Sequence, residues 1–215
     1  MIANHLKYVG LAAFVIGAVS QPAAAAIIGF NTLVGGNGNP YSGSSEAGFT
    51  ITPTQGSWFQ GQVFGNPTPS IFAGPIGSPS PSQIDIVDST LPFTFASVDL
   101  TSNVNLGTTY TIQGFLNNVL VLNQTATPTA INTFQTFASV NSTQLLDKLT
   151  ILGTPATGVT SFNIDNINVT KQVVTVPEPT STLGFLALGT LGAASTLKRK
   201  LKSSKSTKKE TTKVG

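Results

Sequence analysis

The stretch Ser161-Phe-Asn-Ile-Asp-Asn-Ile-Asn-Val-Thr170 decides the fold class, because large apolar residues recur along it at nearly every second position. These apolar residues are Phe162, Ile164, Ile167 and Val169. The alternation breaks once, at Asp165-Asn166, where we expect a local irregularity. Successive side chains of a strand point to opposite faces of a sheet, so the pattern predicts a half-buried β-strand.

Similar short runs, bounded by Gly, Pro, Asn and Ser, fill the chain from Ile27 to about Val174. They predict strands over 28–34, 47–52, 57–64, 83–87, 92–100, 109–116, 118–123, 131–138, 145–152 and 161–170. Asn117-Asn118 predicts a tight hairpin turn between two of these strands. No part of this region has the apolar spacing of a surface helix. We therefore expect an all-β fold, an antiparallel β-sandwich or jelly roll.

One long interruption runs from Gly65 to Ser82 and contains five prolines, at 67, 69, 75, 79 and 81. We expect a loop here, because proline cannot donate a hydrogen bond to a sheet. Loops of this length in compact domains are usually functional or disordered.

The N-terminus has the three parts of a secretory signal peptide. Lys7 is followed by an apolar run from Tyr8 to Ser20 and by Ala23-Ala24-Ala25-Ala26. The apolar run is too short to span a bilayer, and small residues suit signal peptidase. We expect cleavage near Ala26, which makes residues 1–26 a signal peptide and residues 27–175 an exported ectodomain.

The C-terminal part begins with Pro177-Glu178-Pro179 and continues with an uncharged apolar segment over 180–197. The basic cluster Lys198, Arg199 and Lys200 follows it. Eighteen uncharged residues suffice for a transmembrane helix. A basic cluster marks the cytoplasmic side of such a helix, so the ectodomain is expected outside the membrane.

These three elements, in this order, resemble the PEP-CTERM sorting signal over residues 176–200. The resemblance implies an exosortase as partner, a membrane protease that processes the protein at the cell envelope. It also implies a transient anchor in the cytoplasmic membrane and a final place at the cell surface or outside the cell. The chain departs from the family pattern in one respect, because a tail rich in Lys, Ser and Thr follows the basic cluster over 201–215. We expect this tail to be disordered.

The body resembles β-rich ectodomains that precede this sorting signal. The resemblance is carried by Gly48-Phe-Thr-Ile-Thr-Pro-Thr54, Gly56-Ser-Trp58, Val63-Phe-Gly-Asn-Pro67 and Ile164-Asp-Asn-Ile167. The last segment is also similar to the closing strand of some carbohydrate-binding jelly rolls. This second resemblance implies a fold and leaves the activity open.

Charge and composition exclude several classes of function. Eight of the eleven basic residues lie between Lys198 and Lys213, and the region from Ile27 to Val176 has six acids and two bases. A body with a net charge of −4 lacks the basic face that nucleic acid requires. The chain has no cysteine, and its only histidine, His5, lies in the predicted signal peptide. Catalytic triads and ordinary zinc sites are therefore excluded from the mature protein.

Three groups of residues remain as candidate sites. Trp58 and Tyr41 could stack on a sugar ring, although Trp58 lies in a strand pattern and could instead pack in the core. Asp165, with Glu46, could hold a structural calcium ion, the alternative being an edge aspartate bonded to backbone. Paired carboxylates could hydrolyse glycosides, but Asp85 and Asp88 are three apart on one strand and should face opposite ways.

The sequence thus leaves three functions open. The first is a non-enzymatic surface or matrix protein, sorted by an exosortase and contributing to extracellular polysaccharide or biofilm. The second is a carbohydrate-binding module with a jelly-roll fold. The third is an extracellular hydrolase that uses two carboxylates, which could converge only through the fold.

Overall fold

The computed structural model of the protein describes residues 24–77 and 79–172. The predicted sorting segment 176–200, with its helix over 180–197, lies outside these residues. The predicted tail 201–215 and most of the predicted signal peptide 1–26 also lie outside them. In the described part, no helix is long and apolar enough to cross a membrane.

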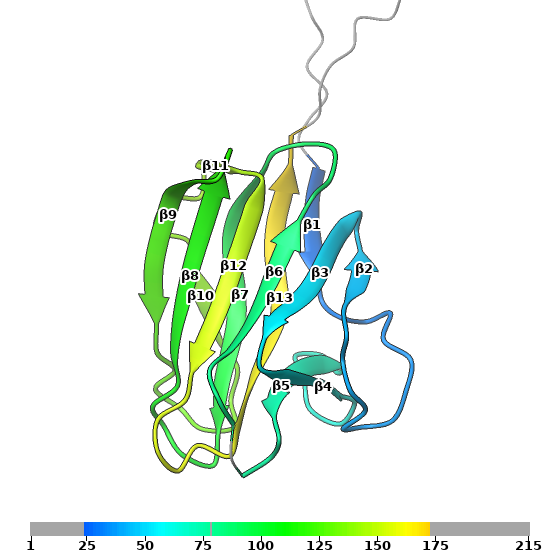
Figure 1. The fold of residues 1–215 in the computed structure, drawn as a ribbon, viewed down its shortest axis with the longest axis vertical. Helices are drawn as coiled ribbons and strands as arrows, with labels where there is room; N and C mark the ends of the chain where they lie inside the picture. Colours follow the sequence, from blue (N-terminus) through cyan, green and yellow to red (C-terminus); the bar gives the residue numbers. More distant parts are fainter. Residues whose placement is uncertain (1–23, 78, 173–215) are drawn as a thin grey trace, which may run out of the picture. The chain divides into compact units, whose positions relative to one another are not determined.

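The described residues form β-strands arranged in two sheets (Figure 1). The strands are β1 Ala24–Ile28, β2 Ser44–Glu46, β3 Phe49–Gln55, β4 Ser57–Gly61, β5 Ser70–Gly74, β6 Ser82–Val87, β7 Phe93–Asn103, β8 Thr109–Leu116, β9 Val119–Ala126, β10 Gln135–Ala138, β11 Leu145–Leu146, β12 Lys148–Thr154 and β13 Ser161–Lys171. All pairs between these strands are antiparallel. The predicted all-β fold is confirmed.

The strand order is that of a jelly roll with additions at its N-terminal side. The seven-stranded sheet contains β10-β7-β13-β5-β4, with β1 beside β13 and β11 beside β7, and the six-stranded sheet has the order β2-β3-β6-β12-β8-β9. From β5 onward the chain crosses between the two sheets at each step except β8 to β9 and β10 to β11, which stay in one sheet. The strands β5-β13-β7-β10 therefore belong to one sheet and β6-β12-β8-β9 to the other. This wrapping is the double-sheet arrangement of jelly rolls.

The apolar faces of the two sheets meet in one core. The Phe162 ring of β13 lies edge-on to Tyr110 of β8, with ring centroids 5.7 Å apart, and to Trp58 at 5.9 Å. Gly153 of β12 lies directly under the Phe162 ring, where a Cβ would collide with it. The alternating residues of the sequence supply this core because every second side chain of a strand faces the opposite sheet.

β13, the strand from which the sequence analysis began, lies inside the seven-stranded sheet. It pairs with β7 along its length, from Ser161 opposite Asn103 to Lys171 opposite Phe93. Its other edge pairs with β5 and then with β1. The register shifts after Asp165, and Asn166 has a φ of 42°, which confirms the predicted irregularity at this point.

Several of the predicted boundaries are wrong. The predicted strand 28–34 corresponds to β1, which ends at Ile28, and the predicted strand 131–138 is reduced to β10. The Pro-rich segment 65–82 is not one long loop, since it contains β5. Every residue of β5 is buried, so this strand has no alternation by which the sequence could reveal it.

The two hairpin turns have the backbone that their residues favour. Asn117 and Asn118 have φ values of 52° and 61°, which confirms the predicted turn between β8 and β9. Positive φ at both central residues is the geometry of the tight hairpin turn that asparagine tolerates. Ala47 and Gly48 form a similar turn with φ of 52° and 79°, so the predicted strand 47–52 begins too early.

An ion pair joins the two sheets at the end of β13. Lys171 Nζ lies 2.6 Å from Asp88 Oδ2, 3.1 Å from the Gly48 carbonyl oxygen and 4.5 Å from the centroid of the Phe49 ring. Burial opposes ionisation of Asp88, but hydrogen bonds from Lys171, Thr90 and Leu91 outweigh it and lower its pKa to about 2. The pair therefore stays charged and stabilises the fold where β13 ends.

We expect Lys171→Met to destabilise the fold by about 3 kcal/mol, because it leaves a buried carboxylate without its cation. Chemical unfolding followed by tryptophan fluorescence measures the change, since Trp58 is buried in the core.

Lys148→Met is the matched control. Lys148 also lies over a phenylalanine, with Nζ 4.7 Å from the centroid of Phe115, but its distance to Asp85 Oδ2 is 4.0 Å and its side chain is 35% exposed. This control substitution should lower the free energy of unfolding by less than about 1 kcal/mol. If the two variants lose the same free energy of unfolding, the ion pair of Lys171 and Asp88 is not a stabilising contact.

Candidate functional site

Four consecutive cross-strand pairs between β7 and β13 are polar on the outer face of the seven-stranded sheet. These pairs are Asn103–Ser161, Thr101–Asn163, Asp99–Asp165 and Ser97–Asn168. We call these eight residues the polar seam. Their apolar neighbours, such as Phe162 and Leu100, face the core. Much of the seam is buried, because the β4–β5 loop bonds to it through Asn66 and the neighbouring strand β10 bonds to it through Thr136.

The middle of the seam holds two buried carboxylates directly opposite each other. Asp165 accepts hydrogen bonds from the backbone N–H groups of Asn66 at 2.6 Å and Asn166 at 2.8 Å. Asp99 accepts hydrogen bonds from Asn66 Nδ2 at 3.1 Å, Asn166 Nδ2 at 2.9 Å and Thr136 Oγ1 at 2.6 Å. Asn166 Nδ2 also contacts the Asn66 carbonyl oxygen. Amide donors thus hold the two acids in place.

Burial raises the pKa of Asp165 to about 7. The N–H groups of Asn66 and Asn166 oppose this rise, and the negative charges of Asp99 and Glu46 add to it. The Asp165 side chain is fully buried. Burial favours the neutral form of this carboxyl group, because a buried charge loses its hydration.

The predicted calcium site of Asp165 and Glu46 is not favoured by this arrangement. Glu46 accepts hydrogen bonds from the backbone N–H groups of Gly29 at 3.2 Å and Phe30 at 2.8 Å, and the Asp165 oxygens face two N–H groups as well. Calcium requires six to eight oxygen ligands, whereas these carboxylates are turned to donors. Within residues 24–77 and 79–172, no cluster of three or more His, Cys, Asp or Glu is placed to hold a metal.

A pocket of about 200 Å³ lies at the Asn103–Ser161 end of the seam. Its apolar wall consists of Val63 and Phe64 from the β4–β5 loop, Phe72 of β5 and Ile76, which follows β5. Phe64 stacks on Phe134 with ring centroids 5.1 Å apart, and Phe72 stacks on Phe59 at 5.5 Å. These stacked pairs hold the aromatic wall in position.

The polar wall of the pocket is uncharged. It consists of the seam residues Asn103, Ser161 and Asn163, with Asn37 and Asn132 from two loops. Asn103 Nδ2 donates to Ser161 Oγ and to Asn163 Oδ1, both at 2.7 Å. Asn163 Nδ2 donates to Ser70 Oγ at 2.9 Å, and Ser70 Oγ donates to the Phe64 carbonyl oxygen at 2.6 Å. A pocket with apolar and amide walls can take a neutral ligand that has both apolar and polar faces.

The structure does not bring the predicted sugar-stacking residues to a surface. Trp58 is 2% exposed and Tyr41 is 4% exposed. Trp58 Nε1 donates to the carbonyl oxygens of Gln55 and Gln83, both at 3.2 Å, and the Tyr41 hydroxyl bonds to Ser44 Oγ at 2.8 Å. The prediction of a sugar-stacking platform at Trp58 and Tyr41 is therefore wrong. Trp58 packs in the core, which was the alternative interpretation.

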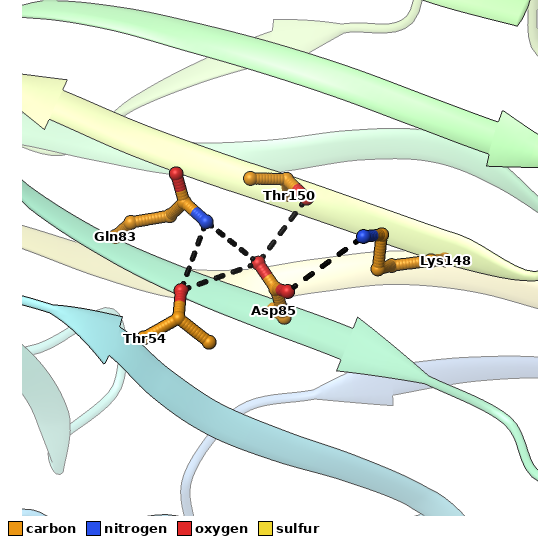
Figure 2. A network of polar contacts seen from close by, with 5 residues as sticks. All are labelled: Thr54, Gln83, Asp85, Lys148 and Thr150. Carbon is orange, nitrogen blue, oxygen red and sulfur yellow. Dashed lines mark hydrogen bonds and ion pairs between the residues drawn. The ribbon is translucent and has the colours of Figure 1, made fainter. Parts of the chain in front are cut away.

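The remaining acids have structural partners. Figure 2 shows Asp85 on the outer face of the six-stranded sheet, where Oδ1 accepts from Thr54, Gln83 and Thr150, and Oδ2 lies near Lys148. Asp88 pairs instead with Lys171, so the two acids do not converge. No carboxylate belongs to the described lining of the pocket, and Asp99 and Asp165 are buried. The predicted hydrolase with paired carboxylates finds no support in the described part of the chain.

The comparisons with known proteins find a distant likeness only. No protein-family model and no curated protein matches the chain. Among solved structures, a mutant of a family 29 carbohydrate-binding module is similar with a TM-score of 0.38 and 12% identity, over 72% of this chain and 100% of that one. A second solved structure, of a family 29 carbohydrate-binding module, has a TM-score of 0.35 and 13% identity, over 75% of this chain and 98% of that one. Likenesses this distant leave the function to the geometry of the chain itself.

We expect the stability of the protein to fall as the pH rises from about 4 to about 7. The pKa of Asp165 in the folded state, about 7, lies above its ordinary value of 3.8. In this window the folded protein binds the proton more tightly than the unfolded chain does. The stabilisation is therefore present at low pH and is lost as the pH rises through the folded pKa.

Asp165→Asn remains neutral and should remove this slope, as urea unfolding across the pH range would measure. Asp147→Asn is the control, because Asp147 bonds to the Asn117 N–H outside the seam. It should retain the slope. If the stability of the unchanged protein does not vary between pH 4 and pH 7, the raised pKa of Asp165 is contradicted.

Proposed function

We propose that the ectodomain is a non-catalytic module that binds a neutral carbohydrate in the pocket at the end of the polar seam. The observation that carries this proposal is the combination of the pocket's walls. Four apolar side chains form one wall, amide and hydroxyl side chains form the other, and no charged residue belongs to the described lining.

The chemistry of a sugar ring fits these walls. A pyranose has an apolar face of C–H groups and an edge of hydroxyl groups that both donate and accept hydrogen bonds. Phe64 and Phe72 offer apolar surface, and the amides of Asn37 and Asn132 offer donors and acceptors. A neutral ligand is favoured because a charged ligand would lose hydration without gaining an opposite charge.

The pocket lies far from the point where the described chain ends. Ser161, in the pocket wall, begins β13, and Lys171 ends it. Ten residues of extended strand separate the two ends by about 33 Å. Ala24 pairs with Lys171, so both ends of the described chain lie together (Figure 1). The pocket lies at the other end of β13, at Ser161. A tether at that end would leave the pocket accessible.

This arrangement suits the exported protein with a C-terminal anchor that the sequence predicts. We propose that the module is displayed at the cell surface, where it binds extracellular polysaccharide after sorting by an exosortase. The residues proposed for sorting are Pro177-Glu178-Pro179 and the basic cluster Lys198, Arg199 and Lys200.

We expect Phe64→Ala to weaken the binding of a neutral polysaccharide or oligosaccharide about tenfold, because the pocket loses a stacked aromatic wall. A glycan array identifies the ligand, and isothermal titration with the purified full chain in detergent measures the affinity.

Phe115→Ala is the matched control, since Phe115 is also half-buried but lies on the outer face of the six-stranded sheet. This variant should bind normally. If no neutral glycan binds, or if both variants bind like the unchanged protein, the pocket is not a carbohydrate site.

The sorting proposal predicts the mass of the mature protein. Cleavage near Ala26 removes Ala24 and Ala25, which are exposed, and retains the fully buried Ile28 of β1. The core should therefore survive this cleavage. Mass spectrometry of the protein from cells with and without an exosortase should show a truncated C-terminus only when the enzyme is present. An intact Gly215 on the outer surface would exclude processing.

A further inference from the structure

Four loops leave the strands at the same end of the two sheets. They join β5 to β6 over 75–81, β7 to β8 over 104–108, β9 to β10 over 127–134 and β12 to β13 over 155–160. The register brings them together, because the end of β7 lies opposite the start of β13 and the end of β12 lies opposite the start of β8. We call these four segments the distal loops, since the described chain begins and ends at the other end of β13.

Hydrogen bonds hold the distal loops in place. The Gly77 N–H donates to the Thr160 carbonyl oxygen at 2.7 Å, and Asn105 Nδ2 donates to the Gly158 carbonyl oxygen at 2.8 Å. These bonds link three of the loops to one another, and the fourth is bonded to β7 through the Asn132 N–H. A surface held in this way loses little conformational freedom when a partner binds.

The distal loops expose aliphatic side chains around one hollow. Val104 is 53% exposed, Leu106 is 50% exposed and Ile131 is 44% exposed, and all three line the hollow together with Ala130. We call these four residues the distal face. The described lining of the hollow contains no aromatic residue, so it lacks the flat surface on which a sugar ring stacks. Aliphatic side chains gain free energy when a partner removes them from water.

The backbone of Val104 points to a role outside the fold. Its φ is 72°, in the left-handed region that a β-branched residue rarely adopts and that glycine or asparagine favours. About half of the residue is exposed, so packing in the core does not account for a valine here. Backbone strain of this kind is typical of residues that contact another molecule.

The distribution of charge favours a second copy of the chain as that molecule. The described part of the chain has six acids and two bases, and all of them lie outside the distal loops. An isologous contact sets a surface against itself, so an uncharged surface avoids the like-charge repulsion between two negatively charged bodies.

The distances involved make this argument quantitative. The charged residue nearest to a distal loop along its own strand is Asp85, three residues from the start of β6 at Ser82, which is about 10 Å of extended strand. Two copies that meet through their distal loops therefore keep their acids about 20 Å apart. This separation exceeds the screening length of about 8 Å at physiological ionic strength.

A bilayer surface suits the distal loops less well. Segments that bind at the membrane interface combine apolar side chains with Trp, Tyr, Lys or Arg, which interact with the headgroups. The four distal loops contain none of these four residue types.

We propose that the distal face binds the same face of a second copy of this chain. The described chain begins and ends at the other end of β13, so copies anchored by that end point the distal face away from the anchoring surface. The contact then joins copies that are held on two opposing surfaces. Few side chains take part, so each contact is weak, and adhesion depends on many copies acting together. This interaction goes beyond carbohydrate binding and does not require it.

Neutral phosphatidylcholine vesicles that include a nickel-chelating lipid test the inference. A C-terminal histidine tag holds the full chain at the vesicle by its C-terminal end, whether or not segment 180–197 inserts. Vesicles that carry the chain should cluster with one another, as light scattering measures, and fluorescent vesicles without protein should stay out of the clusters. No added glycan should be needed.

Leu106→Asp should abolish this clustering, because an isologous contact then includes two carboxylates in place of two apolar side chains. Leu120→Asp is the matched control, since Leu120 is 47% exposed and lies in β9, outside the distal loops. Vesicles with this control should cluster normally. Equal clustering of the two variants, or no clustering of the unchanged chain, overturns the inference.

Val104→Asn separates a contact role from a structural one. Asparagine tolerates the left-handed backbone, so the urea midpoint of unfolding should stay the same or rise, whereas clustering should fall severalfold. A lower midpoint would show that Val104 supports the fold, which contradicts its assignment to the contact.

The other partners give different results. Capture of protein-free vesicles that Leu106→Asp removes identifies lipid as the partner and overturns the second copy. Clustering that requires an added neutral polysaccharide belongs to the pocket and also overturns it. A chain that binds a neutral glycan without clustering retains the proposed function and refutes only this inference.

Discussion

The antiparallel ladder between β13 and β7 is the constraint on which the rest of the structure depends. It brings the last strand of the jelly roll into the middle of the seven-stranded sheet, between β7 on one side and β5 and β1 on the other. Its inner face supplies Phe162, whose ring contacts aromatic residues from both sheets. Its outer face supplies half of the polar seam. Because side chains alternate along a strand, one register determines both the core and the site.

Burial of the polar seam costs desolvation free energy, and hydrogen bonds from the surrounding chain offset most of it. Polar groups removed from water must find hydrogen-bond partners, and charged groups must also find compensation. Asn66 and Asn166 supply donors to the two carboxylates, and Ser70 supplies the acceptor that orients Asn163. The compensation is incomplete in two places, at Asp165, whose pKa is raised to about 7, and at Asn103 Oδ1. The raised pKa of Asp165 makes the stability depend on pH. The unpaired Oδ1 atom belongs to Asn103, a residue of the pocket wall.

The distribution of charge separates structural sites from the proposed binding site. The ion pair of Lys171 and Asp88 joins the two sheets. The hydrogen bonds of Asp85 link β3, β6 and β12, which are neighbours in the six-stranded sheet (Figure 2). The pocket has no charged residue in its described lining and has exposed aliphatic groups instead. Charged residues thus make structural contacts in the domain, whereas amide and hydroxyl side chains form the polar wall of the pocket.

The sequence by itself determined the all-β class, the hairpin turn at Asn117-Asn118 and the irregularity at Asp165, because alternation and turn residues act through local geometry. It could not reveal β5, which is buried on both faces and has no alternation. It also placed Trp58 among candidate sites, since an aromatic residue in a strand has the same local pattern whether it faces the core or the solvent. The polar seam and the pocket depend on which strands pair and in which register, and on a loop that returns to cover them. Only the tertiary structure decided these, because contacts between residues such as Asn66 and Asp165, 99 positions apart, leave no periodic trace in the sequence.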